Sequence, residues 1–171
     1  MKKDYADMIL NNKTEFEKIH NENNDMDISE ADFSHSTIED MDFTNVDFSG
    51  STFLEATISN IDFTDCDLTS VDFSRATLTE CNFSGSILNG TNFNYATVNY
   101  CNFSEADMAG CNLSEANLEN SDFSTSENLD SCRFDESTIW PETEKLPEDF
   151  DCTYNYDLSS LREEDEQSEM Y

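Results

Sequence analysis

The chain has 171 residues, of which 39 are acidic and 8 are basic, so its formal net charge is −31. This charge excludes direct binding to nucleic acid, whose phosphates it would repel. An apolar content of 36% at this charge would suggest disorder in an ordinary globular chain. The apolar residues are gathered at regular intervals, however, and a core built from such a stripe overrules that interpretation.

Residues 1–25 precede the regular part of the sequence. The motif Thr14-Glu15-Phe16-Glu17 predicts a capping box that begins a short helix with Phe16 and Ile19 facing inward. A degenerate repeat starting at Ala6 is the weaker alternative, because it would bring polar side chains to buried places. We expect the helix to cap the first coil. No apolar run follows Met1, so we expect neither a signal peptide nor a membrane span, and a cytoplasmic protein.

A five-residue pattern repeats twenty times between residues 26 and 125. Each unit has an apolar centre, a small residue two places before it and polar residues at the other three places, as in Ala31-Asp32-Phe33-Ser34-His35. We name the place before the centre the second place and the place two after it the corner. A short fixed period predicts a solenoid, in which each unit buries its apolar side by stacking on a neighbour.

A second period of twenty residues predicts four units per coil. Centres twenty residues apart form four columns, two of them nearly pure in Phe and two mostly aliphatic. The Phe columns are Phe33, Phe53, Phe73 and Phe93, and Phe43, Phe63, Phe83, Phe103 and Phe123. The aliphatic columns begin at Ile28 and Ile38. Because the two kinds of column alternate, we expect the Phe columns to face each other across the axis of an all-β solenoid.

These units resemble the repeat of the pentapeptide-repeat proteins, which is a small residue, Asp or Asn, Leu or Phe, and two polar residues. Cys111-Asn112-Leu113-Ser114-Glu115 and Ala116-Asn117-Leu118-Glu119-Asn120 match it at every place. The resemblance covers about two thirds of the chain. It implies a right-handed quadrilateral β-helix over residues 26–140, between an N-terminal cap at 1–25 and a C-terminal segment at 141–171.

Five of the six cysteines occupy the small inward place, where we expect them to pack as small apolar side chains. They are Cys66, Cys81, Cys101, Cys111 and Cys132. Two pairs are one coil apart, at a stacking distance of about 4.8 Å that does not exclude a disulfide. A reduced protein is nevertheless favoured. The chain has no Cys-x-x-Cys motif and only two His, which argues against a zinc site.

After Phe123 the register slips by one residue, since the next centres are Leu129, Phe134 and Ile139. We expect a bulged corner within residues 125–128 that turns Glu127 outward. Trp140 is expected to cover the last layer, next to Pro141.

The C-terminal segment, residues 141–171, has a different pattern. Phe150, Cys152, Tyr154, Tyr156 and Leu158 alternate with polar residues, which predicts a strand. This strand either caps the last coil, whose uncovered edge would template aggregation, or pairs with its copy in a second subunit. In the quinolone-resistance branch of the resembled family a C-terminal module forms the dimer, so the resemblance implies a homodimer through Phe150, Tyr154, Tyr156 and Leu158.

No residue pattern indicates catalysis, and we expect neither an enzyme nor a cofactor. Carboxylates that exchange protons need environments that separate their pKa values, and a convex polar surface offers none. The repeats contain no Lys and no Gly-rich phosphate loop. Columns of single Asp residues also lack the Gly-turned cage of a calcium site, so we expect no metal.

The predicted solenoid, residues 26–140, carries 22 acidic residues against Arg75 and Arg133. Almost six coils at about 4.8 Å each give a rod of roughly 28 Å. That is about one net charge per 1.4 Å, close to the ~1.7 Å of duplex DNA. We therefore predict an acidic mimic of double-stranded DNA that inhibits or modulates a DNA-binding protein through its basic DNA groove. The gyrase-protecting members of the resembled family imply a type II topoisomerase; a nuclease, restriction or phage-defence complex is the other candidate target. The alternative is a non-enzymatic scaffold for an unspecified basic partner.

The acidic residues are unevenly distributed, and twelve of them lie in residues 26–75. The candidate partner-binding residues are Asp27, Asp47, Asp67, Asp42, Asp62, Asp32 and Asp72. Residues 81–104 have no acid and are rich in Asn, with Ile87, Tyr95 and Tyr100 at outward places. Either Asn replaces Asp there to relieve repulsion within a ladder, or Ile87, Tyr95 and Tyr100 form a neutral contact belt.

Overall fold

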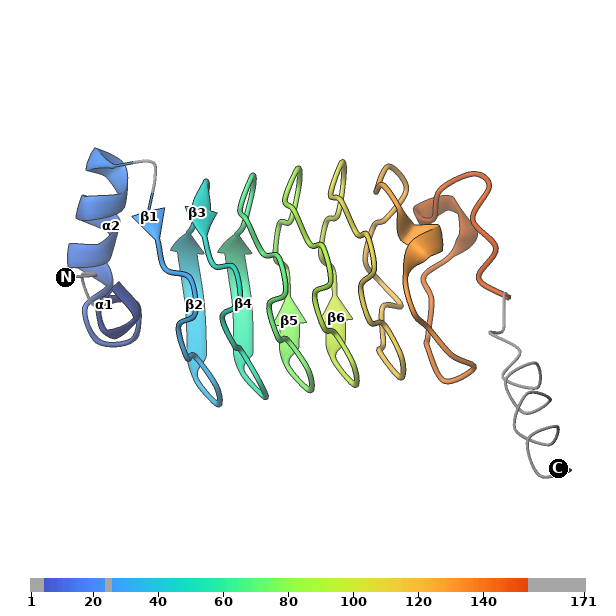
Figure 1. Ribbon diagram of the computed structural model, residues 1–171, viewed down its shortest axis with the longest axis horizontal. Coiled ribbons are helices and arrows are strands. Elements are labelled where there is room, and N and C mark those ends of the chain that lie inside the picture. Colours follow the sequence, from blue (N-terminus) through green and yellow to red (C-terminus); the bar gives the residue numbers. More distant parts are fainter. Residues whose placement is uncertain (1–4, 24–25, 154–171) are drawn as a thin grey trace, which may run out of the picture.

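The computed structural model describes residues 5–23 and 26–153, and it is a rod of stacked coils with two helices at its N-terminal end (Figure 1). The helices are α1 (Tyr5–Asn11) and α2 (Lys13–Glu22). Within the described residues, no helix is long and apolar enough to cross a membrane.

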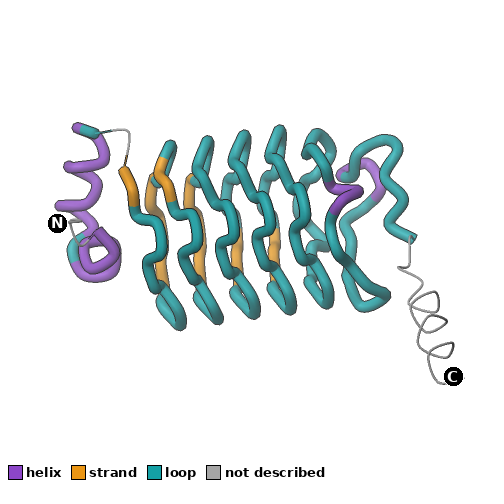
Figure 2. Tube along the Cα trace, in the orientation of Figure 1, coloured by secondary structure: helices purple, strands orange, loops and turns teal. Residues whose placement is uncertain are grey.

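The strands of successive coils pair in parallel with partners twenty residues apart. β1 (Met26–Asp27) pairs with β3 (Val46–Asp47). A four-stranded sheet contains β2 (Thr37–Asp42), β4 (Thr57–Asp62), β5 (Thr77–Thr79) and β6 (Thr97–Asn99), in that order. These strands lie side by side along the rod, and turns and loops make up most of each coil (Figure 2). The molecule is therefore the expected quadrilateral parallel β-helix.

Each coil has four faces, and residues at the second place form one parallel ladder on each face. Face 1 carries Asp27, Asp47, Asp67, Ile87, Asp107 and Glu127. Face 2 carries Asp32, Thr52, Asp72, Asn92, Asn112 and Arg133. Face 3 carries Thr37, Thr57, Thr77, Thr97, Asn117 and Ile139. Face 4 carries Asp42, Asp62, Asn82, Asn102 and Asp122.

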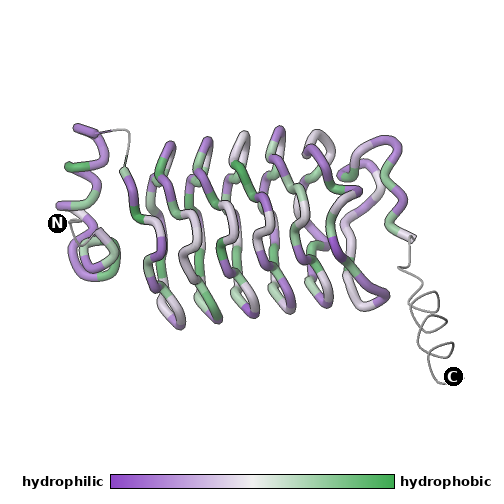
Figure 3. The backbone as a smooth tube through the Cα atoms, in the orientation of Figure 1, coloured by the Kyte–Doolittle hydropathy of each residue, from purple (hydrophilic) through white to green (hydrophobic). Residues whose placement is uncertain are grey.

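The two Phe columns fill the core as the twenty-residue period predicts. On face 2 the ring centroids of consecutive Phe residues are 4.7 to 5.3 Å apart. On face 4 the corresponding distances are 4.4 to 5.5 Å. From Phe53 to Phe103 the two columns meet edge to face, with centroids 6.1 to 6.4 Å apart. Figure 3 shows the resulting regular recurrence of apolar residues along each coil.

The corners use left-handed backbone, although the chain has only four Gly. In every unit from Glu30 to Glu115 the corner residue has a φ between 52° and 69°. This conformation costs a non-Gly residue about 1–2 kcal/mol, so the hydrogen bonds of the stacked coils must hold it. At the corner Gly85 an added Cβ would lie 2.5 Å from Oδ1 of Asp65, so the Asp65 side chain would have to move to admit it.

The N-terminal cap consists of two helices where the sequence predicted one, and the expected capping box is wrong. Asn12 is the N-cap of α2 and accepts a hydrogen bond from the Glu15 amide, so Thr14 lies inside the helix. Phe16 is fully buried, with its ring centroid 5.4 Å from that of Phe43. The cap also supplies polar contacts to the edge of the first coil: the Lys13 ammonium donates to backbone carbonyls of β2.

The C-terminal coils contain two extra residues instead of one. Glu127 keeps the twenty-residue spacing from Asp107 and is exposed, whereas Arg133 pairs with Asn112 and Ile139 with Asn117. The first extra residue is Asn128, which is exposed and left-handed between Glu127 and the buried centre Leu129, so it lies within the expected segment 125–128; η1 (Leu129–Ser131) follows it. The second extra residue precedes Ile139.

The prediction that Ile139 is a buried centre is wrong, because this side chain is 49% exposed. The Ile139 carbonyl accepts the Leu118 amide at 2.7 Å, which gives Ile139 the outward second place. Trp140 takes the inward place instead. Stacking then continues past residue 140, since the Phe123 amide donates to the carbonyl of Lys145, at the end of η2 (Thr143–Lys145).

An aromatic cluster closes the C-terminal end. The Trp140 ring packs against Phe134 and Phe150, at centroid distances of 5.2 and 5.0 Å. The strand expected from Phe150 onward is wrong for the described part, since residues 148–153 form turns, one of them closed by a hydrogen bond from Phe150 to Pro147. Tyr154, Tyr156 and Leu158 lie outside the described residues. Phe150 therefore covers the last coil.

Candidate partner-binding surface

The acidic ladders predicted from the sequence are brought together on faces 1 and 4. Asp27, Asp47 and Asp67 stand in register on consecutive coils of face 1. Asp42 pairs with Asp62 on face 4. Asp32 and Asp72 share face 2, but Thr52 separates them.

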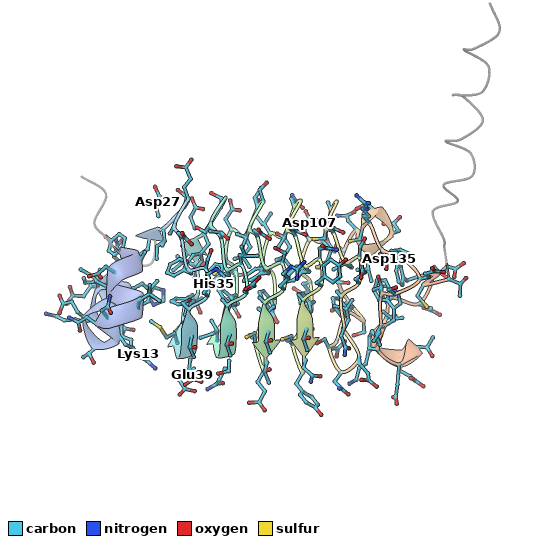
Figure 4. The ribbon with its side chains drawn as sticks, turned by 90° about the horizontal axis from the view of Figure 1, so that it is seen from below. Lys13, Asp27, His35, Glu39, Asp107 and Asp135 are labelled. Carbon is cyan, nitrogen blue, oxygen red and sulfur yellow. The ribbon has the colours of Figure 1, made fainter. Side chains whose placement is uncertain are left out.

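Faces 1 and 3 lie on opposite sides of the rod. In Figure 4, Asp27 and Asp107 of face 1 lie along one edge of the view, and Glu39, on the strand of face 3, points away from the opposite edge. Faces 4 and 1 are neighbours, because consecutive pentapeptides occupy consecutive faces. The corner that they share carries a further acid, Asp65, which is exposed.

The second-place carboxylates also stabilise the corners. Oδ1 of Asp47 accepts the Ser49 amide at 2.8 Å, and the same bond to the residue two places later recurs at the other ladder positions. The further acceptors are Asp27, Asp32, Asp42, Asp62, Asp67, Asp72, Asp107 and Asp122. This turn is a known preference of Asp and Asn. The sequence analysis missed it, although the recurring Asp-x-Ser/Thr spacing was its signal.

The hydrogen bonds of these turns favour the charged form of the carboxylate. The Ser34 hydroxyl and amide hold the pKa of Asp32 below its ordinary value. Burial alone would raise the pKa of Asp42, but hydrogen bonds from the Thr44 hydroxyl and amide outweigh it and the net pKa is lowered. Both residues are therefore ionised at neutral pH.

Asn relieves the ladders where it replaces Asp. The Asn82 side-chain amide donates to Oδ1 of Asp62 at 3.3 Å, and the Asn92 amide donates to Oδ1 of Asp72 at 3.1 Å. On the next coil Asn102 donates to Asn82 at 3.1 Å. Stacked carboxylates could not form such bonds, which supports the repulsion-relieving interpretation of the Asn-rich coil.

The corner column between faces 2 and 3 has mixed charge, which the sequence analysis did not notice. Nδ1 of His35 lies 3.3 Å from Oε2 of Glu55, and the Arg75 guanidinium carbon is 5.0 Å from the centroid of the Tyr95 ring. A hydrogen bond with Glu115, and then the charge of that carboxylate, raises the pKa of the Tyr95 hydroxyl. Tyr95 is thus held between a cation and an acid.

The three residues of the alternative contact belt do not form one patch. Ile87 lies on face 1, between Asp67 and Asp107. Tyr95 and Tyr100 occupy the two corners that flank face 3, on the opposite side of the coil. All three are exposed, Tyr100 the most at 62%. Any neutral contact surface would therefore consist of face 3 and its two flanking tyrosines, without Ile87.

Sequence-family models place the repeat pattern over most of the chain. A model described as "Pentapeptide repeat region" matches residues 14–93, and a model described as "Pentapeptide repeats (8 copies)" matches residues 86–124 and 101–138. Together with the four-sided coils, these matches decide the family. The chain is a pentapeptide-repeat protein. No curated protein sequence matches this pentapeptide-repeat protein.

Several solved structures are similar to this pentapeptide-repeat protein. One is a pentapeptide repeat protein from the thylakoid lumen of Arabidopsis thaliana, with 26% identity over 53% of this chain and 67% of that one and a TM-score of 0.45. A second is Rfr23 from the cyanobacterium Cyanothece 51142, with 22% identity over 67% of this chain and 90% of that one and a TM-score of 0.44. A third is QnrB1, a plasmid-mediated fluoroquinolone resistance protein, with 14% identity over 82% of this chain and 97% of that one and a TM-score of 0.35.

Proposed function

We propose that this pentapeptide-repeat protein binds a DNA-binding protein by presenting the acidic ladders of faces 1 and 4 in place of the phosphates of duplex DNA. The observation that carries the proposal is the register of the ladders, since Asp27, Asp47 and Asp67 stack directly above one another. Proteins of this family generally act as non-enzymatic interaction scaffolds or DNA mimics.

In the first coils, two acidic ladders run side by side along one edge of the rod. The ladders of faces 4 and 1 run on either side of the corner that holds Asp65. The rungs of a ladder repeat about every 4.8 Å, which is comparable to the charge spacing of one DNA strand, about 3.4 Å. A basic groove that accepts duplex DNA would meet two parallel rows of carboxylates along this edge.

A bacterial type II topoisomerase is the first target to test, in a titration with duplex DNA as competitor at two salt concentrations. Under the proposal, binding weakens as salt rises and DNA displaces the protein. The variant Asp27→Asn, Asp47→Asn, Asp67→Asn removes three charges from face 1 and keeps the acceptors of the corner turns. At about 0.2–1 kcal/mol per exposed pair, the loss is about 3- to 150-fold in affinity.

The matched control removes three charges from the opposite side of the rod. Glu39 and Glu119 lie on face 3, Glu55 lies at the corner between faces 2 and 3, and all three are exposed. The triple Gln variant at these positions has the same net charge as the face 1 variant and retains wild-type affinity if the ladders are the binding site. Equal loss in both variants would mean that overall acidity alone drives binding.

The second candidate function is a scaffold that binds through face 3 and its flanking tyrosines. The exposure of Tyr95 and Tyr100, 45% and 62%, favours it, since exposed aromatic side chains are common anchors of interfaces. If Tyr100→Ala abolishes binding while the face 1 variant binds normally, this candidate replaces DNA mimicry.

A further inference from the structure

Cys81 and Cys101 stack on one another inside the solenoid. Their backbones are neighbours on consecutive coils, because the Asn102 amide donates to the Cys81 carbonyl at 3.0 Å and Asn82 pairs with Asn102. Both side chains are 2% exposed. The backbones of the two residues are therefore related by a translation of about 4.8 Å along the axis.

The thiols of this pair are held less firmly than the other buried thiols. Cys66, Cys111 and Cys132 donate to backbone carbonyls at 2.9, 3.0 and 3.1 Å. The carbonyl contacts of Cys81 and Cys101 are longer, the shortest being 3.5 and 3.4 Å. Cys101 also hydrogen-bonds to Cys81; this bond lowers the pKa of Cys81 and, together with burial, raises that of Cys101.

The rise of one coil suits a bridging ion better than a disulfide. A disulfide requires Cβ atoms about 3.5–4.5 Å apart and sulfurs about 2.05 Å apart, so side chains stacked at about 4.8 Å would have to lean toward each other. Bonds from two-coordinate Cu(I) to thiolate are somewhat shorter than the ~2.3 Å of tetrahedral zinc–thiolate bonds, so two of them in a line span a little less than ~4.6 Å, close to the rise of one coil.

We propose that Cys81 and Cys101 bind a soft two-coordinate cation, Cu(I), in a linear site parallel to the solenoid axis. Thiolates select Cu(I), zinc and iron–sulfur clusters, and of these only Cu(I) is satisfied by two thiolates. Each thiol gives up its proton to water as its sulfur bonds to the ion, so one bound ion releases two protons. The described residues contain no group of three or more His, Cys, Asp or Glu that could hold a metal, so the site does not suit tetrahedral zinc.

The test titrates Cu(I) into the reduced full-length chain without oxygen, against a coloured Cu(I) chelator that reports the ions retained per chain. Cys101→Ser is expected to retain one ion fewer than the wild type. The substitution is compatible with folding, because Ser121 occupies the next rung of the same inward column. Cys66→Ser is the matched control, since it removes a buried thiol with no stacked cysteine, and it retains the wild-type number.

Burial could slow uptake, so the titration is repeated with Cu(I) present while the chain refolds from guanidinium. X-ray absorption of the loaded Cys66→Ser variant is expected to show two sulfur neighbours per copper. The proposal is overturned if Cys101→Ser and Cys81→Ala retain as many ions as the wild type, if no ion is retained after refolding, or if each copper has three or more sulfur neighbours. None of these readouts depends on the binding partner.

Discussion

The Phe columns determine the width of the solenoid, and Phe83→Ala tests how much of the stability they supply. The Phe83 side chain is fully buried. Its ring stacks on Phe63 and Phe103, at centroid distances of 5.0 and 4.8 Å, and meets Phe73 and Phe93 edge to face at 6.1 and 6.4 Å. Removal of the ring leaves a cavity that neighbours fixed by their own coils cannot fill.

The expected cost is about 3–5 kcal/mol, the usual range for a buried Phe replaced by Ala. Each lost aromatic pair is worth about 0.5–1.5 kcal/mol beyond its area, so the upper part of this range applies. For a chain of this size, 4 kcal/mol lowers the melting temperature by about 8–16 °C. Guanidinium titration followed by far-UV circular dichroism measures the free energy of unfolding, and thermal melts check it.

Phe83→Leu is the conservative control, because Leu113 already fills a centre in the opposite Phe column. Its loss is expected to be clearly smaller than that of Phe83→Ala. A loss below about 1 kcal/mol for Phe83→Ala would contradict the view that the stacked rings carry the core.

Two further predictions concern acid and the C-terminal segment. The folded-state pKa of Asp42 is lowered, so the stability that its carboxylate contributes is full above the unfolded pKa of about 3.9 and is lost as pH falls through the lower folded pKa. Asp42→Asn keeps the hydrogen-bond acceptor and should therefore flatten the fall in melting temperature below about pH 4. An unchanged slope of melting temperature against pH would contradict this prediction. We also propose that the protein forms a homodimer through Tyr154, Tyr156 and Leu158. A chain ending at Thr153 keeps the cap made by Phe150, and light scattering should show that it is a monomer. If it keeps the oligomeric state of the full-length chain, the removed segment has no part in assembly.

The architecture could be predicted from the sequence because the repeat is strict. Five-residue and twenty-residue periods together determine the four faces and the columns of the core, and the pairing of Thr37, Thr57, Thr77 and Thr97 follows them. The left-handed corners could not be predicted, since residues as different as Glu30, Arg75 and Tyr100 adopt them. There the stacked hydrogen bonds override the preference of each residue.

Predictions failed where the repeat ends, because local signals then compete. Thr14 and Asn12 are both good N-caps, and only the packing of α2 on the first coil decides between them. Near Ile139, two apolar residues in succession left the inward place ambiguous. Trp140 takes it, since its larger ring covers the last layer and contacts Phe134 and Phe150.

The candidate site was harder to predict because the second-place residues do two things at once. Their side-chain oxygen accepts the amide of the residue just before the corner, as any Asp or Asn can, and the charge of Asp enters the ladder. From the sequence alone, an Asp that is present for its charge cannot be distinguished from an Asp that is present to accept the hydrogen bond of the turn. Ile87 is close to Tyr95 and Tyr100 in the sequence, but it lies at the second place of face 1, whereas the two tyrosines are the corners that flank face 3.

The structure does separate the two properties. Asn82 and Asn102 accept the amide two residues later on face 4, as Asp42 and Asp62 do, and they add a hydrogen bond to the coil before. The acceptor at the second place can therefore be supplied without a negative charge. Asp at consecutive rungs instead adds repulsion between coils. The first coils nevertheless keep Asp where Asn would stack better, and this excess charge along the edge of faces 4 and 1 is the feature for which binding to a basic DNA groove supplies a physical reason.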